Sequence, residues 1–257
     1  MKNINMVVDI GNTNIVIGFY SNTEYQYSWR INTDKAKTED EYFSIIKQLA
    51  DEQDLILSQI NKVAISSVVP KITRVFSYLI KKYVKCDIEI VNAYSELGLK
   101  FPMKDPGFIG SDLIVNAFSA ILKYKTNCII CDFGTATTIQ LVGKDGLFFG
   151  TIIAPGVITS AKNLFDSTAL LSNVQLEKPE HLLGTNTTDA LLSGIVTGNS
   201  LMLDGFIKAI KNEYKHLGSF KTIATGGIAE LICKDSKEID IIDVNLTLDG
   251  LNFICCK

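Results

Sequence analysis

The chain has 257 residues, enough for one or two domains that bury a substantial core without disulfide or metal staples. Hydrophobic residues make up 47% and charged residues 21%, which excludes a disordered or low-complexity chain. The net charge is −3 without long blocks of like charge, so we expect no nucleic-acid partner. The apolar stretches, such as residues 113–122, are too short to cross a bilayer, and no signal-peptide core opens the chain. We therefore expect a cytoplasmic protein without a membrane segment.

The first half of the chain predicts three strands and then alternating helices and strands. Apolar runs at 6–10 and 15–19 flank a short polar turn, and a third strand is expected at 25–31. A capping box and an N-terminal proline mark the starts of two helices. The later elements are a helix after Thr38-Glu39-Asp40-Glu41, a strand at 62–67, a helix from Pro70, a strand at 88–91 and a helix after Gly110.

The second half repeats this order. Strands are expected at 129–133, 139–142, 147–153, 221–227 and 239–242, with a long amphipathic helix, or two broken at glycine, at about 188–214. Strands that alternate with helices indicate an α/β fold, and the hairpins make its sheets mixed. We expect two similar halves, each with a mixed five-stranded sheet flanked by helices, and a ligand in a cleft between them.

Two turns of the pattern Asp-x-Gly follow equivalent strands, at Asp9 and at Asp132. A glycine after a strand lets the backbone approach a ligand, and the next N–H groups can face phosphate oxygens. The two carboxylates could hold a cation that neutralises a polyphosphate. Each turn alone is more typical of a simple Asx-type turn in a hairpin. Their duplication, with Gly226-Gly227 at the end of a later strand, favours the phosphate site.

The cysteines and histidines predict no redox or metal chemistry. Cys128 and Cys131 form a C-x-x-C pattern, but the pattern lies inside a predicted strand and lacks a second pair of ligands. We expect reduced thiols. The histidines, His181 and His216, lie outside glycine-rich or acidic segments, so we expect them to be solvated.

Together these motifs resemble the type III pantothenate kinases, which belong to the actin-like and sugar-kinase superfamily of duplicated ribonuclease-H-like domains. The resemblance covers nearly the whole chain. The motifs that carry it are Asp9-Ile10-Gly11-Asn12-Thr13-Asn14, Gly110-Ser111-Asp112, Asp132-Phe133-Gly134-Thr135-Ala136-Thr137, Ala154-Pro155-Gly156, Ser193-Gly194 and Ala224-Thr225-Gly226-Gly227-Ile228-Ala229.

The resemblance implies two ribonuclease-H-like halves, residues 1–115 and 116–257, and three groups of site residues. The expected ATP-binding residues are Asp9, Ile10, Gly11, Asn12, Thr13, Asn14, Ile15, Val16, Thr135, Gly226 and Gly227. The expected substrate-binding residues are Gly110, Ser111, Asp112, Leu113 and Thr187, with Asp112 as the catalytic proton acceptor. Asp9 is expected near the Mg²⁺ of ATP, and Asp132 as the ligand of a monovalent cation, K⁺ or NH₄⁺. The family is cytoplasmic and homodimeric, and it phosphorylates pantothenate with ATP in the first step of coenzyme A biosynthesis.

Two of these residues have a simpler interpretation. Asp112 precedes an apolar run and could be a helix N-cap, with Ser111 as the alternative cap. Thr187 also begins a helical segment and could serve only as a cap.

The chain departs from the family pattern on the substrate side. The family usually has Gly-Ala-Asp-Arg, whereas Leu113 stands here in place of the arginine, and Met103 replaces a frequent tyrosine. Three functions therefore remain open: a pantothenate kinase, a kinase of the same superfamily for another small alcohol, and a non-catalytic nucleotide-binding relative.

Overall fold

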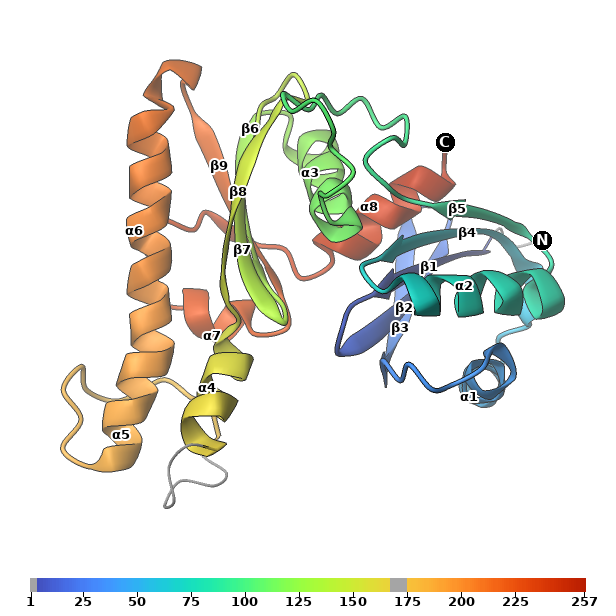
Figure 1. Cartoon of the computed structure of the whole chain (residues 1–257), viewed down its shortest axis with the longest axis horizontal. Coiled ribbons are helices and arrows are strands. Elements are labelled where there is room, and N and C mark those ends of the chain that lie inside the picture. The colour runs from blue at the N-terminus through green and yellow to red at the C-terminus, as the bar shows by residue number, and fades with distance from the viewer. Residues whose placement is uncertain (1–3, 167–174) are drawn as a thin grey trace. The chain divides into compact units, whose positions relative to one another are not determined.

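The computed structural model describes residues 4–166 and 175–257, and the chain divides there into two compact units (Figure 1). The first unit holds the residues up to Gly98, Met103–Ser119 and Leu246–Lys257. The second holds Leu99–Pro102 and Ala120–Asn245. This division differs from halves at 1–115 and 116–257, because the C-terminal helix packs on the sheet of the first unit.

The first unit is built on a mixed five-stranded sheet of order β3-β2-β1-β4-β5. β1–β2 and β2–β3 pair antiparallel, whereas β1–β4 and β4–β5 pair parallel. The strands are β1 Ile4–Ile10, β2 Asn14–Ser21, β3 Glu24–Asn32, β4 Ile60–Ser67 and β5 Asp87–Ile90. All five expected strands of this half are therefore confirmed.

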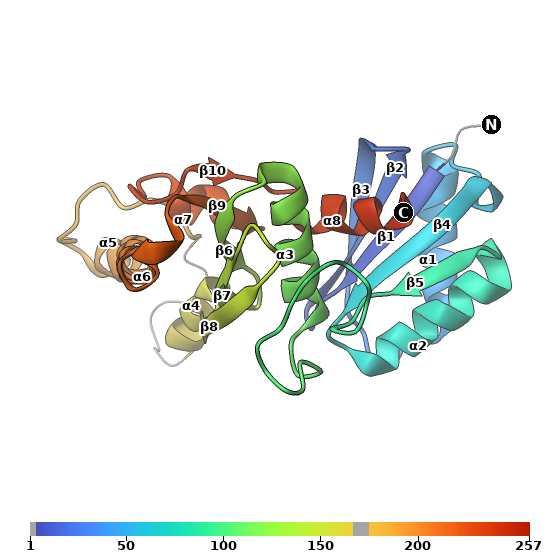
Figure 2. The same cartoon turned by 90° about the horizontal axis from the view of Figure 1, so that it is seen from above.

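Helices cover both faces of this sheet. On one face, α1 (Glu39–Glu52) and α2 (Pro70–Leu79) bury Tyr42 and Phe76 against alternate residues of β1 and β4. The expected capping box at Thr38 and the proline at the start of α2 are both present. The other face carries α8 (Leu246–Cys255), which lies on the opposite side from α1 and α2 (Figure 2). α3 (Ser111–Tyr124) begins in this unit and packs against α8 at Gly250.

The second unit repeats the design with a sheet of order β10-β9-β6-β7-β8. Its strands are β6 Asn127–Phe133, β7 Ala136–Val142, β8 Phe148–Pro155, β9 Phe220–Gly226 and β10 Ile241–Ile242. Its helices are α4 Val157–Asp166, α5 Thr187–Leu192, α6 Gly198–Glu213 and α7 Ala229–Cys233. Apolar side chains of β6 and β7 form the core with α4 and α6, and Figure 1 shows α6 along this sheet. The predicted α/β fold with two mixed sheets is confirmed.

The long helix of the second unit does not break at its glycines. α5 continues through a π-helical segment, Ser193–Thr197, into α6, and Gly198 keeps right-handed helical dihedrals. The resulting helix, Thr187–Glu213, is long and apolar enough to cross a bilayer by length and composition, which corrects our expectation that no segment reaches that length. A core helix meets the same two criteria, and Leu203 and Ile207 of α6 are fully buried in the unit's core.

Two buried asparagines attach α8 to the first sheet. The Asn5 Nδ2 group donates to Asn252 Oδ1 at 2.9 Å, and Asn252 Nδ2 donates to the Asn22 carbonyl oxygen at 2.8 Å. Both side chains are almost fully buried, so neither can replace these partners with bulk water. The position of α8 therefore depends on polar contacts as well as apolar packing.

We expect Asn252→Ala to lower the free energy of unfolding by about 1–3 kcal/mol, because it removes two hydrogen bonds and leaves the buried Asn5 amide with only the weak acceptor Cys256 Sγ. Urea denaturation measures this, with Asn212→Ala on the exposed side of α6 as the control. Equal midpoints for the two variants would contradict a structural role for the Asn252 contacts.

Candidate active site

The turn between β1 and β2 is closed by backbone and side-chain hydrogen bonds. The Gly11 N–H donates to the Asn14 carbonyl oxygen at 2.9 Å, and Thr33 Oγ1 donates to the Gly11 carbonyl oxygen at 2.7 Å. The side chains of Asn12 and Thr13 are exposed at its tip. Two hydrogen bonds thus hold the turn, and its two polar side chains lie at the surface, where they could meet an anionic ligand.

Two of the residues expected to bind ATP lie in the core. Ile10 and Ile15 are fully buried, so only their backbone groups could contact a nucleotide. Asn14 and Val16 are half-buried at the start of β2.

Asp9 lies near the end of β1, directly opposite Ser66 of β4. Paired residues of neighbouring strands point to the same face of a sheet. Met6 and Val8 of β1 and Ile65 of β4 pack toward α1 and α2, so Asp9 and Ser66 face the opposite side. That is the side on which α3 begins, since Ser111 Oγ lies 3.1 Å from Ser66 Oγ.

Asp112 is in the first turn of α3 and does not cap the helix. The Ile114 N–H donates to the carbonyl oxygen of Gly110, which places Gly110 at the N-cap. Asp112 Oδ1 accepts from the adjacent Leu113 N–H at 2.9 Å, and burial raises the pKa of the carboxyl group. Ser111 Oγ accepts from the Ser67 N–H at 2.7 Å, in the neighbouring strand. The structure therefore supports neither serine nor aspartate as the cap.

Gly110 is required by the position of this carboxylate. A Cβ on Gly110 would lie 2.3 Å from Asp112 Oδ1. The carboxylate therefore packs directly over the glycine.

Leu113 and Thr187 have different surroundings. Leu113 is only 7% exposed, so its isobutyl group belongs to the core of the first unit and offers a ligand no polar contact. Thr187 is the exposed first residue of α5, and the cap of that helix is Asn186, whose side chain accepts from the Asp189 N–H. The capping interpretation of Thr187 is therefore wrong. Met103 is half-buried.

In the second unit, Asp132 and Gly226 are brought together by parallel pairing of β6 with β9. Gly226 has a φ of +97°, and a Cβ there would lie 2.8 Å from Asp132 Oδ1 and 2.6 Å from the Phe133 carbonyl oxygen. A side chain at position 226 would therefore collide with a carboxylate and a carbonyl oxygen, so the two strand ends approach closely only because residue 226 is glycine. Gly227, the next residue, is exposed.

Gly156 supports the turn after β6 in a similar way. A Cβ on Gly156 would lie 2.0 Å from the Thr135 carbonyl oxygen, and Thr159 Oγ1 donates to that oxygen at 3.1 Å. Because the start of α4 holds this carbonyl, the side chain of Thr135 remains exposed at the turn.

The two cysteines of the C-x-x-C pattern are core residues. Cys128 and Cys131 are buried in β6, all six cysteines are free, and burial raises the pKa of Cys128 to about 12. Thiols with raised pKa values are poor nucleophiles at neutral pH. Both histidines are exposed, as expected.

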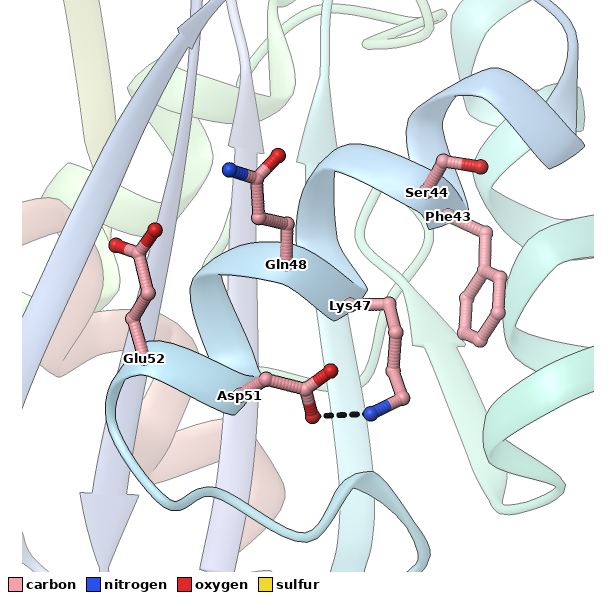
Figure 3. Close-up of a pocket in the computed structure, with 6 residues that line it drawn as sticks. All are labelled: Phe43, Ser44, Lys47, Gln48, Asp51 and Glu52. Atoms are coloured by element: carbon pink, nitrogen blue, oxygen red, sulfur yellow. Dashed lines mark hydrogen bonds and ion pairs between the residues drawn. The ribbon is translucent and has the colours of Figure 1, made fainter.

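Two hollows of the described surface lie away from these residues. One of about 620 Å³ lies on the outer side of α1, where all its lining residues are drawn, including the ion pair Lys47–Asp51 (Figure 3). Another of about 300 Å³ lies beside α6 and α7. Neither is lined by the Asp-x-Gly turns or by Asp112. Within residues 4–166 and 175–257, no group of three or more His, Cys, Asp and Glu side chains is placed to hold a metal ion.

Sequence reasoning did not identify three contributors. Thr33 closes the first turn, Ser67 anchors Ser111, and Asn186 caps α5. The Asn-x-x-Asp spacing at 186–189 was a readable capping pattern. Nothing local to Thr33 or Ser67 indicates their partners, because these are 22 and 44 residues away in the chain.

Comparison with known proteins relates the chain to kinases. A family model of type III pantothenate kinase matches residues 5–209. A Baf family protein from Campylobacter jejuni, described as a transcriptional activator, is 19% identical, with 97% of this chain and 96% of that chain covered and a TM-score of 0.52. A ROK family glucokinase from Streptomyces griseus, solved with glucose and AMPPNP, is 11% identical, with 98% and 99% covered and a TM-score of 0.55. The ethanolamine utilization protein EutJ from Carboxydothermus hydrogenoformans is 13% identical, with 97% and 89% covered and a TM-score of 0.58. At these identities the solved structures show a shared fold only.

Asp112→Asn tests the carboxylate directly. The variant keeps an acceptor for the Leu113 N–H but loses the base, so we expect kcat to fall about 10²- to 10⁴-fold. Because burial raises the pKa of Asp112, the wild-type kcat/KM should fall with decreasing pH at a pH above the ordinary aspartate value of about 4.

The free energy of unfolding of Asp112→Asn shows whether its lower kcat comes from the lost carboxylate or from misfolding. A carboxyl group whose pKa is raised in the folded state costs stability once the pH rises above its unfolded pKa. Removing its charge should therefore leave the free energy of unfolding at pH 8 unchanged or higher. Asp105→Asn, in the preceding exposed loop, is the control and should keep its activity. Unchanged turnover in Asp112→Asn would exclude the base.

Gly156→Ala should raise the KM for ATP, because the new Cβ must displace the backbone of Thr135. Gly205→Ala is the matched control, since a Cβ on Gly205 in α6 meets open space and an alanine favours the helix. Steady-state kinetics with varied ATP compares the two. A similar KM in both variants would show that the turn does not contact the nucleotide.

Proposed function

Since the chain belongs to the type III pantothenate kinase family, we propose that it transfers the γ-phosphoryl group of ATP to the primary hydroxyl of pantothenate. The product would be 4′-phosphopantothenate, and the reaction would be the first step of coenzyme A biosynthesis. The observation that carries this proposal is the family match over residues 5–209, together with a half-buried carboxylate of raised pKa, Asp112, at the expected position of the base.

The proposed ATP contacts rest on the turn after β1. Phosphoryl transfer requires positioning and charge neutralisation more than covalent help. The turn at Gly11 presents Asn12 and Thr13 to solvent, and neutral donors of this kind suit phosphate oxygens. Thr135, Gly226 and Gly227 are the proposed contacts from the second unit.

The proposed base is Asp112. A carboxylate can accept the proton of an alcohol late in the reaction if it lies within hydrogen-bond reach. Its burial disfavours the charged form, so it binds a proton more readily than an exposed aspartate does. Gly110 and Thr187 are also proposed to contact pantothenate.

Two cations complete the proposal, and the residues present fit them. Asp9 is half-buried beside the first turn and would face the Mg²⁺ that accompanies ATP. Asp132 Oδ1 and the Phe133 carbonyl oxygen both lie beside the backbone of Gly226, and oxygen ligands of this kind suit K⁺ or NH₄⁺. A bound cation would supply positive charge against the phosphate groups.

The acceptor alcohol depends on the residues that surround Asp112. Leu113 replaces the arginine usual in the family and is buried, which favours a second candidate, a kinase of the same superfamily for another small alcohol. Lys100 and Lys104 precede the Asp112 motif and could pair with the carboxylate of pantothenate. The Lys100 Nζ atom already lies 3.6 Å from Asp145 Oδ2, so Lys104 is the better candidate.

The deciding experiment incubates the purified protein with ATP, Mg²⁺, K⁺ and a panel of small alcohols that includes pantothenate. Detection of the phosphate ester by mass spectrometry identifies the acceptor. A phosphate ester of a different alcohol would support the second candidate, and ATP binding without any ester would support a non-catalytic relative.

We further propose that the protein is cytoplasmic and acts as a homodimer.

We expect activity to require K⁺ or NH₄⁺ in addition to Mg²⁺, and Asp132→Ala to weaken both this requirement and ATP use. The measurement is ADP release in K⁺, NH₄⁺, Na⁺ and tetramethylammonium at fixed ATP and Mg²⁺. Asp235→Ala, an exposed aspartate of the same unit, is the control. Equal rates in all four salts would count against the monovalent site.

A further inference from the structure

The hollow beside α6 and α7 is lined by two hydroxyl groups that lack partners in the described part of the chain. Its volume is about 300 Å³, at the small end of ligand pockets, and it lies wholly in the second unit, where the two helices contact each other (Figure 1). Ser200 of α6 is only 8% exposed, yet its Oγ makes no hydrogen bond with any residue that the structure describes. Thr197, three residues earlier, also lines the hollow, and its hydroxyl likewise has no partner within residues 4–166 and 175–257. Both hydroxyls are therefore available to a bound molecule.

A buried serine inside a helix ordinarily satisfies its hydroxyl on the backbone of its own helix. Ser77 of α2 does so, since its Oγ donates to the Thr73 carbonyl oxygen at 2.8 Å. The corresponding acceptor for Ser200 would be Val196, which belongs to the π-helical segment Ser193–Thr197. Segments of this kind often occur at functional sites. An unpaired buried hydroxyl costs free energy, which a ligand oxygen that accepts its hydrogen bond would recover.

Lysine side chains supply the charge around this hollow. The lysines that line it are Lys178, Lys208 and Lys237. The first of them is paired with Asp235, at 2.6 Å. The Nζ atom of the second lies 3.9 Å from Glu238 Oε1, and the other oxygen of that carboxylate accepts from Lys211 at 2.8 Å. Lys237 forms no ion pair with any described residue, so its charge is available to a ligand.

The floor of the hollow contains a buried carboxylate, Asp204, whose two oxygens are already used. Asp204 Oδ1 accepts from Ser236 Oγ, and Oδ2 accepts from the Lys237 N–H at 3.1 Å. The second bond fixes the backbone of Lys237 beside the hollow. Among the lining residues and their ion-pair partners, four lysines face three carboxylates, which leaves one positive charge. One surplus charge suits a carboxylate better than a phosphate monoester, whose charge at pH 7 is about −1.5 to −2.

The walls between these polar groups are apolar. Val196 and Ile232 are buried in them, whereas Leu201 is 61% exposed beside the hollow. Water gains little from contact with such a surface, and the carbon chain of a ligand would cover it favourably. The hollow therefore combines hydroxyl donors and a cation with an apolar wall.

We propose that this hollow binds a small aliphatic monocarboxylate. The carboxylate accepts hydrogen bonds from the hydroxyls of Ser200 and Thr197 and pairs with Lys237, and the carbon chain lies against Leu201 and Leu231. None of the lining residues belongs to the proposed ATP, pantothenate or cation contacts. Binding here is thus independent of the proposed function, and its test does not require kinase activity.

The test uses hexanoate as the probe, with hexanol and hexylamine as comparisons of equal chain length. Titration of the whole ¹⁵N-labelled protein, followed by NMR, reports the amide signals of Ser200 and Leu231. We expect these signals to shift saturably at millimolar hexanoate. Hexanol should bind about ten-fold more weakly, because it lacks the charge-assisted hydrogen bonds, and hexylamine should not bind. The absence of a saturable shift, or equal binding of hexanol or hexylamine, would overturn the proposal.

Two variants test the assigned residues. Ser200→Ala should raise the Kd for hexanoate about ten-fold, yet leave the free energy of unfolding without probe unchanged or higher, since the hydroxyl has no partner to lose and alanine favours a helix. Ser77→Ala is its matched control, because it removes a hydrogen-bonded helical serine and should lower stability without changing the Kd. Lys237→Met should also raise the Kd, whereas Lys234→Met, at an exposed lysine outside the hollow, should not. An unchanged Kd in either Ser200→Ala or Lys237→Met would overturn the assignment.

Discussion

The parallel pairing of β1 with β4 is the constraint on which the candidate site of the first unit depends. Its register sets Asp9 beside Ser66 and leaves the ends of both strands at one edge of the sheet. Because paired residues share a face, the strand ends and the first turn of α3 meet on the side opposite α1 and α2. A shift of one residue would turn Asp9 into the apolar core and Val8 out of it. The alternation of side-chain direction along β1 therefore determines on which face of the sheet the carboxylate lies.

Much of the fold could be predicted because its signals are local. The strands on either side of the Asp-x-Gly turns were readable from β-branched runs, and the start of α1 from four consecutive residues at Thr38. The repeat of the same order of elements in both halves was stronger evidence for the fold than either half alone.

The features that could not be predicted from the sequence are long-range contacts and local backbone conformations. The contact of Ser111 with Ser67 spans 44 residues, and no pattern near either serine indicates it. The π-helical turn at 193–197 was not predicted either: the glycines at 194 and 198 left open whether the helix breaks, and the structure shows that it continues. The role of Asp112 as a cap was decided only by the hydrogen bond of Gly110 with Ile114. Cap and base need the same residue type at the same place, so composition alone cannot distinguish them.

The position of α8 has a consequence for the order in which the chain acquires its structure. Residues 120–245 form one uninterrupted stretch of the second unit, whereas the first unit is completed only by residues 246–257. During synthesis from the N-terminus, the ribosome releases every strand of the first sheet long before the helix that covers its second face. Until then the Asn5 amide and the apolar side chains beside it have no partner in α8. The nascent first sheet therefore exposes an apolar face for the time needed to translate more than half of the chain. Deletion of α8 would make that exposure permanent.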